Sequence, residues 1–202
     1  MTCVEPDHFH EDDGAIGPQP WMQYRQVATV SAASKAGSYP VAGGGPKNDL
    51  LQTAKVSWVN NTPVSQYVYG LVTRAGAAMA LQGRSRAHLV AYHGLSMAAG
   101  DPPLVEVSRF GVGLDVGAGG TFGNNAAFGV AEQRQNSHTM PLMPSVTGWT
   151  LLTPGQMFTG MVSLRFISEF WETQAVAGGE EGSESSYISG DTRLDLFAVP
   201  VV

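Results

Sequence analysis

The chain has little charge, few lysines and a single cysteine. Charged residues make up 14% of its 202 residues, and the formal net charge is −6. The only lysines are Lys35, Lys47 and Lys55, so no dense basic stripe is present that would neutralise a phosphate backbone. We therefore predict no nucleic acid partner. Cys3 has no second cysteine to pair with, so packing rather than a disulfide within the chain must hold the fold together.

Long apolar runs are also missing. A helix that crosses a bilayer needs about 20 apolar residues in a row, and no stretch of this sequence approaches that length. The first residues, MTCVEPDHFHEDDG, are acidic and lack the basic start and apolar core of a secretory signal. We expect no membrane insertion and no export signal.

Short β-prone stretches separated by turn residues fill most of the chain. The 25 glycines and 12 prolines divide it into segments rich in β-branched and aromatic residues. This pattern predicts an all-β fold, an antiparallel β-sandwich that is jelly-roll-like or Ig-like, with about eight or nine strands. We predict strands at residues 55–59, 66–73, 77–82, 86–92, 104–110, 127–132, 156–170 and 193–199.

The strongest predicted strand is QMFTGMVSLRFISEF, at residues 156–170. Its three phenylalanines, Val162 and Leu164 share one parity and its polar residues mostly share the other, which is typical of a strand with one buried face. Thr153, Pro154 and Gly155 form a turn signal between Leu151, Leu152 and this strand, and we expect a short strand at the two leucines to pair with the long one as a hairpin. The predicted buried residues are Phe158, Val162, Leu164, Phe166 and Phe170, and the predicted outward residues are Thr159, Ser163, Arg165 and Glu169.

Residues 1–50 differ from the rest in composition, and we predict an extended N-terminal arm there, followed by a sandwich domain at 51–202. The arm is rich in Pro, Gly, Asp and Ser. Within it, WMQYRQVATV at residues 21–30 is a candidate strand or clip against a neighbour, with Trp21, Tyr24, Val27 and Val30 as candidate interface residues. The arm either orders on a partner or is a disordered leader without contacts. We expect loops at the glycine-rich residues 111–125 and the acidic residues 178–186.

One acidic segment, DHFHEDD at residues 7–13, is a candidate metal site. His8 and His10 project to the same side of an extended chain, so a neighbouring copy would complete a shell of imidazoles and carboxylates. The alternative is a solvated acidic leader, which we favour because two histidines without a fixed second shell rarely bind a metal alone.

Motifs of the common enzyme classes are missing, so we predict no enzyme and no cofactor. GVGLDVG at residues 111–117 has Val116 where a dinucleotide fingerprint needs its third glycine. His88 and His93 have opposite parity, and His138 is expected at the surface. Aromatic residues would either line a sugar groove or pack in the core and at edges, and we favour packing. These aromatics are Trp58, Tyr67, Tyr69, Tyr92, Trp149 and Trp171.

Several stretches of the sequence carry a family resemblance: WVNNTPVSQYVYGLVTRAG, QGRSRAHL, EVSRFGVGLDVGAG, TMPLMPSVTGWTLLTPGQ, ISEFWE and ESSYISGDTRLDLFAVP. Through them the chain resembles minor tail proteins of phages that infect mycobacteria and related actinobacteria. The resemblance runs from Cys3 to the C-terminus, and its most specific part is residues 185–200. It brings no catalytic residues with it.

The resemblance implies a structural virion protein at or near the tip of a long, non-contractile tail, made in the cytoplasm of the host bacterium. The implied partners are other phage tail proteins and further copies of this chain, as a trimer or as a hexamer around the tail axis. Contact with the host cell surface is an additional expectation. The alternative function is a carbohydrate-binding or glycan-degrading tail module that touches the host envelope.

Overall fold

The computed structural model describes residues 9–12, 15–18, 23–39, 46–82, 84–114, 130–142, 149–172 and 185–201. Within these ranges the regular structure consists of β-strands without a helix, which confirms the all-β prediction. Accordingly, the described residues include no helix that is long and apolar enough to span a membrane. The strands are β1 (Phe9–Asp12), β2 (Ala15–Pro18), β3 (Arg25–Ala32), β4 (Ala36–Tyr39), β5 (Lys47–Val59), β6 (Gln66–Arg74), β7 (Ala77–Gln82), β8 (Arg84–Ser96), β9 (Val105–Leu114), β10 (Val130–Gln135), β11 (His138–Pro141), β12 (Thr150–Leu152), β13 (Met157–Glu172), β14 (Ser185–Ile188) and β15 (Thr192–Pro200).

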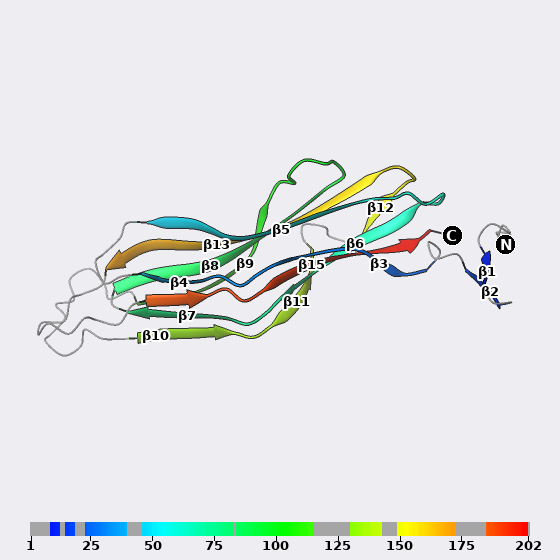
Figure 1. Cartoon of the computed structure of the whole chain (residues 1–202). Helices are drawn as coiled ribbons and strands as arrows, with labels where there is room; N and C mark the ends of the chain where they lie inside the picture. The colour runs from blue at the N-terminus through cyan, green and yellow to red at the C-terminus, as the bar shows by residue number, and fades with distance from the viewer. Residues whose placement is uncertain are drawn as a thin grey trace, which may run out of the picture.

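Two of the sheets form one layer. Their strand orders are β10-β7-β14-β4 and β11-β6-β15-β3, so each strand of one sheet is followed or preceded in the chain by its counterpart in the other. We call these strands together the interrupted layer, because each leaves the ladder for two or three residues before it resumes. The facing sheet, β5-β13-β8-β9, has unbroken strands, and we call it the continuous layer. Figure 1 shows the strands of both layers running along the length of the molecule.

The connection between strands is that of a jelly roll. If each interrupted strand is counted once, the order along the chain is β3/β4, β5, β6/β7, β8, β9, β10/β11, β13 and β14/β15. The first pairs with the last, β5 with β13, β6/β7 with β10/β11, and β8 with β9, all antiparallel. A ribbon paired in this nested way and rolled into two layers is a jelly roll, which decides between the two predicted sandwich types.

Two hydrophobic clusters fill the space between the layers, and β13 contributes to both. Leu164 and Phe166 belong to one cluster, while Phe158 and Val162 belong to the other. All four side chains are buried, as the alternation along the strand predicts. Further members of the first cluster are Ala77, Met79, Ala87, Leu89, Ala91 and Phe110, and of the second Val68, Val72, Leu142, Leu152, Leu194, Leu196 and Ala198.

The side chain of Gln52, on β5, forms hydrogen bonds with backbone and side-chain groups at two of the breaks in the interrupted layer. Its Nε2 donates to the carbonyl oxygens of Ala33 at 2.6 Å and Gly190 at 2.7 Å, and its Oε1 accepts from Thr192 Oγ1 at 2.9 Å. Carbonyls that leave the ladder are therefore paired by a buried amide. Gly190 has φ +70°, and a Cβ there would lie 2.6 Å from the carbonyl oxygen of Ala75, so this junction requires glycine.

The predicted hairpin between residues 151–152 and the long strand is wrong. β12 pairs with β6, not with β13, so the leucines extend the interrupted layer. The turn itself is present, because Gln156 N donates to Thr153 O at 3.1 Å. It carries the chain from one layer to the other instead of reversing it within a sheet.

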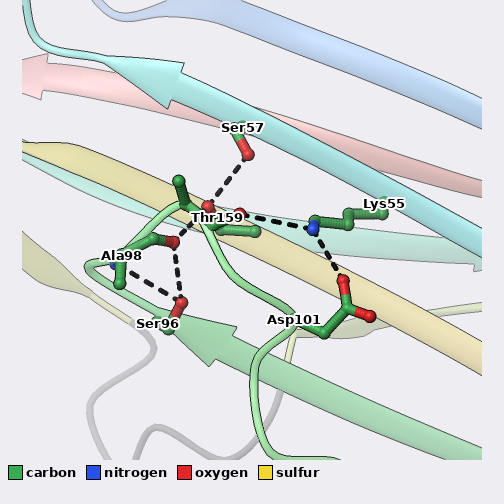
Figure 2. Close-up of polar contacts among 7 residues, drawn as sticks. Lys55, Ser57, Ser96, Ala98, Asp101 and Thr159 are labelled. Carbon is green, nitrogen blue, oxygen red and sulfur yellow. Dashed lines mark hydrogen bonds and ion pairs between the residues drawn. The ribbon is translucent and has the colours of Figure 1, made fainter.

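The outer face of β13 is more buried than the alternation predicts. Thr159 and Ser163 are 0% and 1% exposed. The connection from β8 to β9 crosses this face: Thr159 Oγ1 donates to Ala98 O at 2.8 Å, and Lys55 Nζ lies 2.6 Å from Asp101 Oδ1 (Figure 2). Because β13 is a central strand covered by a loop, its small polar side chains are buried on that face as well.

Strand pairing extends beyond two predicted boundaries. β3 and β4 take part in the interrupted layer, and β5 passes through residue 50, so pairing within the chain begins before the predicted domain boundary. β9 continues through residues 111–114 of the predicted glycine-rich loop. A Cβ at Gly111 would lie 2.4 Å from Ala87 O, so glycine permits that pairing with β8. The acidic segment 178–184 and residues 115–125 lie outside the described residues.

Candidate functional site

The two faces of the interrupted layer differ in chemistry. Along β15, Leu194, Leu196 and Ala198 are fully buried against the continuous layer. The residues between them point outward, since successive side chains of a strand alternate between faces. β6 alternates in the same way in register with β15. The outward residues are Arg193, Asp195, Phe197 and Val199 on β15 and Tyr67, Tyr69, Leu71 and Thr73 on β6.

Five aromatic rings gather on this outer face, and we call them the aromatic face: Tyr24, Tyr67, Tyr69, Trp149 and Phe197. The Phe197 ring stacks on those of Tyr24 and Tyr69, with centroid distances of 5.4 and 5.3 Å and interplanar angles of 4° and 19°, and the rings of Tyr24 and Tyr69 stack on each other at 6.2 Å. Trp149 lies 4.3 Å from Tyr69 and meets Tyr67 edge to face at 6.4 Å. The rings of Tyr24, Phe197 and Tyr69 therefore form a triangle, and Trp149, the residue before β12, joins it through Tyr69.

One end of the aromatic face is hollowed. Tyr67, Trp149 and Val199 line a hollow of about 320 Å³, which we call the ring hollow. Tyr67 and Trp149 remain 41% and 42% exposed. Two rings at 81° to each other thus form an open corner whose walls are apolar.

A second hollow, of about 630 Å³, lies on the same sheet at the level of the interruption. We call it the junction hollow; most of its surface is apolar, and the polar residues that line it include Ser31, Thr73, Arg74, Asp191 and Arg193. Asp191 Oδ1 accepts a hydrogen bond from Ser34 N at 2.7 Å, which fixes this carboxylate beside the chain break. The hollow is therefore lined by hydroxyl groups, one carboxylate and two arginines, the exposed Arg193 and the buried Arg74.

Asp195 lies between the two hollows and is 3% exposed. Its Oδ1 accepts hydrogen bonds from Gln26 Nε2 at 3.0 Å and Thr29 Oγ1 at 2.7 Å, and its Oδ2 accepts from Arg193 Nε at 2.8 Å. The buried carboxylate is thus paired with a guanidinium and two neutral donors. The middle of the outer face carries little unbalanced charge as a result.

One tyrosine of the aromatic face, Tyr69, has a raised pKa. The hydroxyls of Tyr24 and Tyr69 are hydrogen-bonded to each other. Burial, followed by this hydrogen bond, raises the pKa of Tyr69 to about 12. Near neutral pH the Tyr69 side chain is therefore neutral.

A separate polar group lies inside, where the two hydrophobic clusters meet. Arg74 is 2% exposed and His93 is fully buried. Burial lowers the pKa of Arg74, and burial together with the charge of Arg74 lowers the pKa of His93 to about 4. His138, opposite Arg74 on β11, lowers the pKa of His93 further and is half-buried rather than at the surface as predicted. His93 is on the core side of β8 and His88 on the other side, as their parity predicts.

The predicted site residues are dispersed. Tyr24 joins the aromatic face, whereas Val27 and Val30 pack against the second hydrophobic cluster of the same chain. Trp21 and His8 lie outside the described residues, as does the side chain of His10. Within the part of the chain that the structure describes, no group of three or more His, Cys, Asp or Glu side chains is placed to hold a metal ion. The metal and partner interfaces of the N-terminal segment stay predictions.

Phe197, Val199 and the residues of the junction hollow were not predicted as site residues. A signal for part of the surface is present in the sequence, since Tyr67 and Tyr69 share one parity, as do Phe197 and Val199. Their assembly into one face depends on the register of β15 with β6, in which Tyr67 opposes Val199 and Tyr69 opposes Phe197. Trp149 joins them because β12 pairs with β6.

Comparison with known proteins gives a family match over the whole chain. No curated protein matches the sequence. Among solved structures, a chain titled "Structure of infectious bursal disease virus Gx strain" is similar at 14% identity and a TM-score of 0.27, covering 98% of this chain and 42% of that one. This chain thus spans less than half of the viral chain, and a TM-score of this size does not establish a shared fold. A family model described as a domain of unknown function, DUF7172, matches residues 1–202. The chain therefore belongs to the DUF7172 family.

Proposed function

We propose that this protein is a non-enzymatic structural component of a virion, located at or near the tip of a long, non-contractile phage tail. The observation that carries the proposal is the place of the most specific stretch of the resemblance, residues 185–200. This stretch forms β14 and β15, which pair on both sides, with β3 and β4 and with β6 and β7. The residues shared with minor tail proteins are therefore those that close the jelly roll.

The distribution of buried and exposed side chains supports a role in which the protein acts through its surface. Two hydrophobic clusters fill the interior, and the buried polar groups between them hold the layers together. Large apolar side chains are exposed on the outer face of the interrupted layer, including Tyr24 at 54% and Leu151 at 45%. Exposed apolar groups gathered on one face mark an interaction surface.

The proposal predicts that purified virions contain the protein. An antibody against the chain, visualised by immunogold electron microscopy on intact phage, should label the tail tip. A phage in which the gene carries an early stop codon should yield particles with missing or incomplete tail tips in a cryo-EM reconstruction, and complementation should restore them. Virions that lack the protein by mass spectrometry, with normal tails in the stop-codon phage, would overturn the proposal.

Copy number is part of the proposal. We infer a trimer, or a hexamer around the tail axis, because a closed ring on the axis must follow the symmetry of the tail. Symmetry-expanded density at the tail tip, with the jelly roll fitted into it, gives the number of copies directly. A single copy in an asymmetric position would contradict this part and leave the virion location intact.

A glycan-binding tail module is the second candidate function. The two hollows on one face of the interrupted layer favour it, because apolar rings and hydroxyl groups lie on the same surface.

A further inference from the structure

We propose that the junction hollow binds a singly charged carboxylate with a small apolar body, and that the buried guanidinium of Arg74 is its charge partner. The hollow has a volume of about 630 Å³ and lies where the strands of the interrupted layer leave the ladder. The proposal does not depend on a structural role in the tail, since it concerns a ligand of the isolated protein.

Arg74 differs from the other buried polar side chains at this level of the fold. Thr192 donates a hydrogen bond to Gln52 at 2.9 Å. Ser189 Oγ accepts one from Lys35 N at 2.8 Å. Arg74 is 2% exposed, and neither its Nε nor its Nη2 has a hydrogen-bond partner within the described part of the chain. Because buried polar groups are nearly always paired, an unpaired guanidinium beside a hollow indicates a ligand.

The positive charge of Arg74 has no counter-charge among the residues that the structure describes. No carboxylate of these residues forms an ion pair with it, and burial lowers its pKa without an opposing effect of a carboxylate. An arginine nevertheless stays charged at neutral pH. The neighbouring His93, whose pKa is lowered to about 4, is neutral there and supplies no negative charge. A buried cation without a counter-ion is costly, so an anion that reaches Arg74 gains more than it would at an exposed arginine.

The two unpaired nitrogens of Arg74 indicate which group the ligand presents. Nε and Nη2 form one edge of the guanidinium, and their N–H groups point the same way. Two parallel donors match the two oxygens of a carboxylate, which accepts both hydrogen bonds at once. Both nitrogens are buried, so binding requires the guanidinium to turn towards the hollow that Arg74 lines.

The lining of the hollow comes from both faces of the interrupted layer. One cross-strand row of the lining lies on the outer face and consists of Ser31, Thr73 and Arg193. The adjacent row, which lies on the inner face by alternation, consists of Ala32, Arg74 and Thr192. Arg74 and Thr192 are the buried members of the lining, so they form the floor of the hollow. A ligand that enters from the outer face therefore approaches Arg74 through the break in the layer.

The rest of the lining favours an apolar body and a single negative charge. Most of the surface is apolar, and Ala33 and Ala75 contribute to it together with Ala32. The exposed carboxylate of Asp191 also lines the hollow and would repel a second negative charge. The Arg193 guanidinium is paired with Asp195 at 2.8 Å, and the chain carries a net charge of −6. A monocarboxylate therefore fits better than a phosphate or a polyanion.

A free organic acid and the carboxyl end of a polypeptide both present this chemistry, so the test uses a probe for each. Sodium isobutyrate represents the free acid and N-acetylalanine the chain end, and the amides of both are the neutral comparisons. The purified full chain, labelled with ¹⁵N, is titrated while the arginine Nε–H resonances are followed by NMR, and the thermal unfolding midpoint is measured by circular dichroism. We expect a saturable shift of the Arg74 resonance and a rise of the midpoint, with a Kd of about 1 mM for the tighter acid. The amides and sodium chloride at equal concentration should have neither effect, and the tighter acid identifies the source of the carboxylate.

Three variants separate this site from a general effect of anions. Arg74→Met keeps a long side chain without charge, so it should abolish the response, and its midpoint in plain buffer should not fall below that of the wild type. Arg134→Met removes an exposed arginine of β10 outside the hollow, and its response should equal that of the wild type. Asp191→Asn keeps the shape of the side chain and removes the negative charge from the hollow, so it should tighten isobutyrate binding severalfold.

The proposal is wrong if neither acid shifts the Arg74 resonance saturably, if the amides act as strongly as the acids, or if Arg74→Met keeps the full response. Sulfate or phosphate that binds more tightly than both acids would overturn the assignment to a carboxylate. If Arg74→Met does not fold, the titration of the Arg74 resonance in the wild type and in Asp191→Asn decides. The location of the protein in the virion is measured separately, so failure of the carboxylate proposal leaves the tail proposal unaffected.

Discussion

The inner and outer faces of β6 and β15 are formed by alternate residues of the same two strands and have different roles. On the inner face, Val68, Val72, Leu194 and Leu196 are fully buried in one hydrophobic cluster. On the outer face, ring surfaces and hydroxyl groups remain exposed around two hollows. Since the side chains alternate, one strand contributes to stability through every second residue and presents a surface through the others.

This comparison indicates where substitutions should act. An inner substitution should lower the free energy of unfolding and affect binding only by unfolding the protein. An outer substitution should change binding and leave the free energy of unfolding almost unaltered. The three predictions below test this division, and the last concerns an outer residue that we expect to behave as an inner one.

The largest effect is expected for Leu196→Ala compared with Tyr67→Ala. Leu196 is 0% exposed within the second cluster, so truncation leaves a cavity and should lower the free energy of unfolding by about 2–5 kcal/mol. Tyr67 is 41% exposed, and its truncation should cost less than about 1 kcal/mol. Urea denaturation followed by tryptophan fluorescence measures both. Equal losses for the two variants would show that the aromatic face is part of the core.

The next effect concerns the polar group inside. The pKa of His93 is lowered to about 4 in the folded protein, from 6.5 in an unfolded chain. Between these values the unfolded chain binds a proton that the folded protein does not. The contribution of His93 to stability is therefore complete above pH 6.5 and is lost as the pH falls towards about 4, by about 3 kcal/mol in total.

His93→Gln isolates this contribution, because other groups also titrate in the same range. The free energy of unfolding of the wild type should fall more steeply from pH 7 to pH 4 than that of the variant, by the same amount of about 3 kcal/mol. Denaturant titrations at intervals of pH measure both curves. Parallel curves would show that His93 takes up a proton in the folded state as readily as in the unfolded one.

Sequence patterns predict the strands and the inner face well. The alternation at residues 156–170 identifies Phe158, Val162, Leu164 and Phe166 as core residues, and the structure buries all four. Local apolar periodicity is sufficient for this, since burial of one face requires only that the strand packs on something. The same logic does not reveal that Thr159 is covered, because the covering residue, Ala98, is far away in sequence.

The strand β4 and the burial of Arg74 depend on contacts between residues that are distant in sequence, which composition alone does not reveal. Residues 36–39 contain a glycine and resemble a loop, yet they form β4, and a Cβ at Gly37 would lie 2.7 Å from the ring of Tyr187. The glycine makes room for a ring that stacks on Phe166 at 5.0 Å. Likewise Arg74 precedes a turn signal in the sequence, and its burial follows from its place at the interruption of the layer. The outer aromatic face depends in the same way on the register of distant strands.

The smallest effect, and the exception to the comparison, is expected for Asp195→Asn. Asp195 points outward but is 3% exposed and accepts hydrogen bonds from Gln26, Thr29 and Arg193. An amide is neutral and accepts through one oxygen only, so the bond from Arg193 loses its charge partner. Because the three donors retain access to water, the free energy of unfolding should fall by about 1–2 kcal/mol.

Asp191→Asn is the matched control for this variant, since Asp191 is exposed and accepts a single backbone hydrogen bond. Its loss should be smaller than that of Asp195→Asn when both are measured by urea denaturation. If the two variants lose equal stability, the Asp195 hydrogen bonds contribute no more than an exposed contact does. Asp195 would then contribute no more to the free energy of unfolding than an exposed residue does. The direction of a side chain would alone decide whether a residue of β15 stabilises the fold. If Asp195→Asn loses more, burial decides a residue's contribution even on the face that carries the hollows.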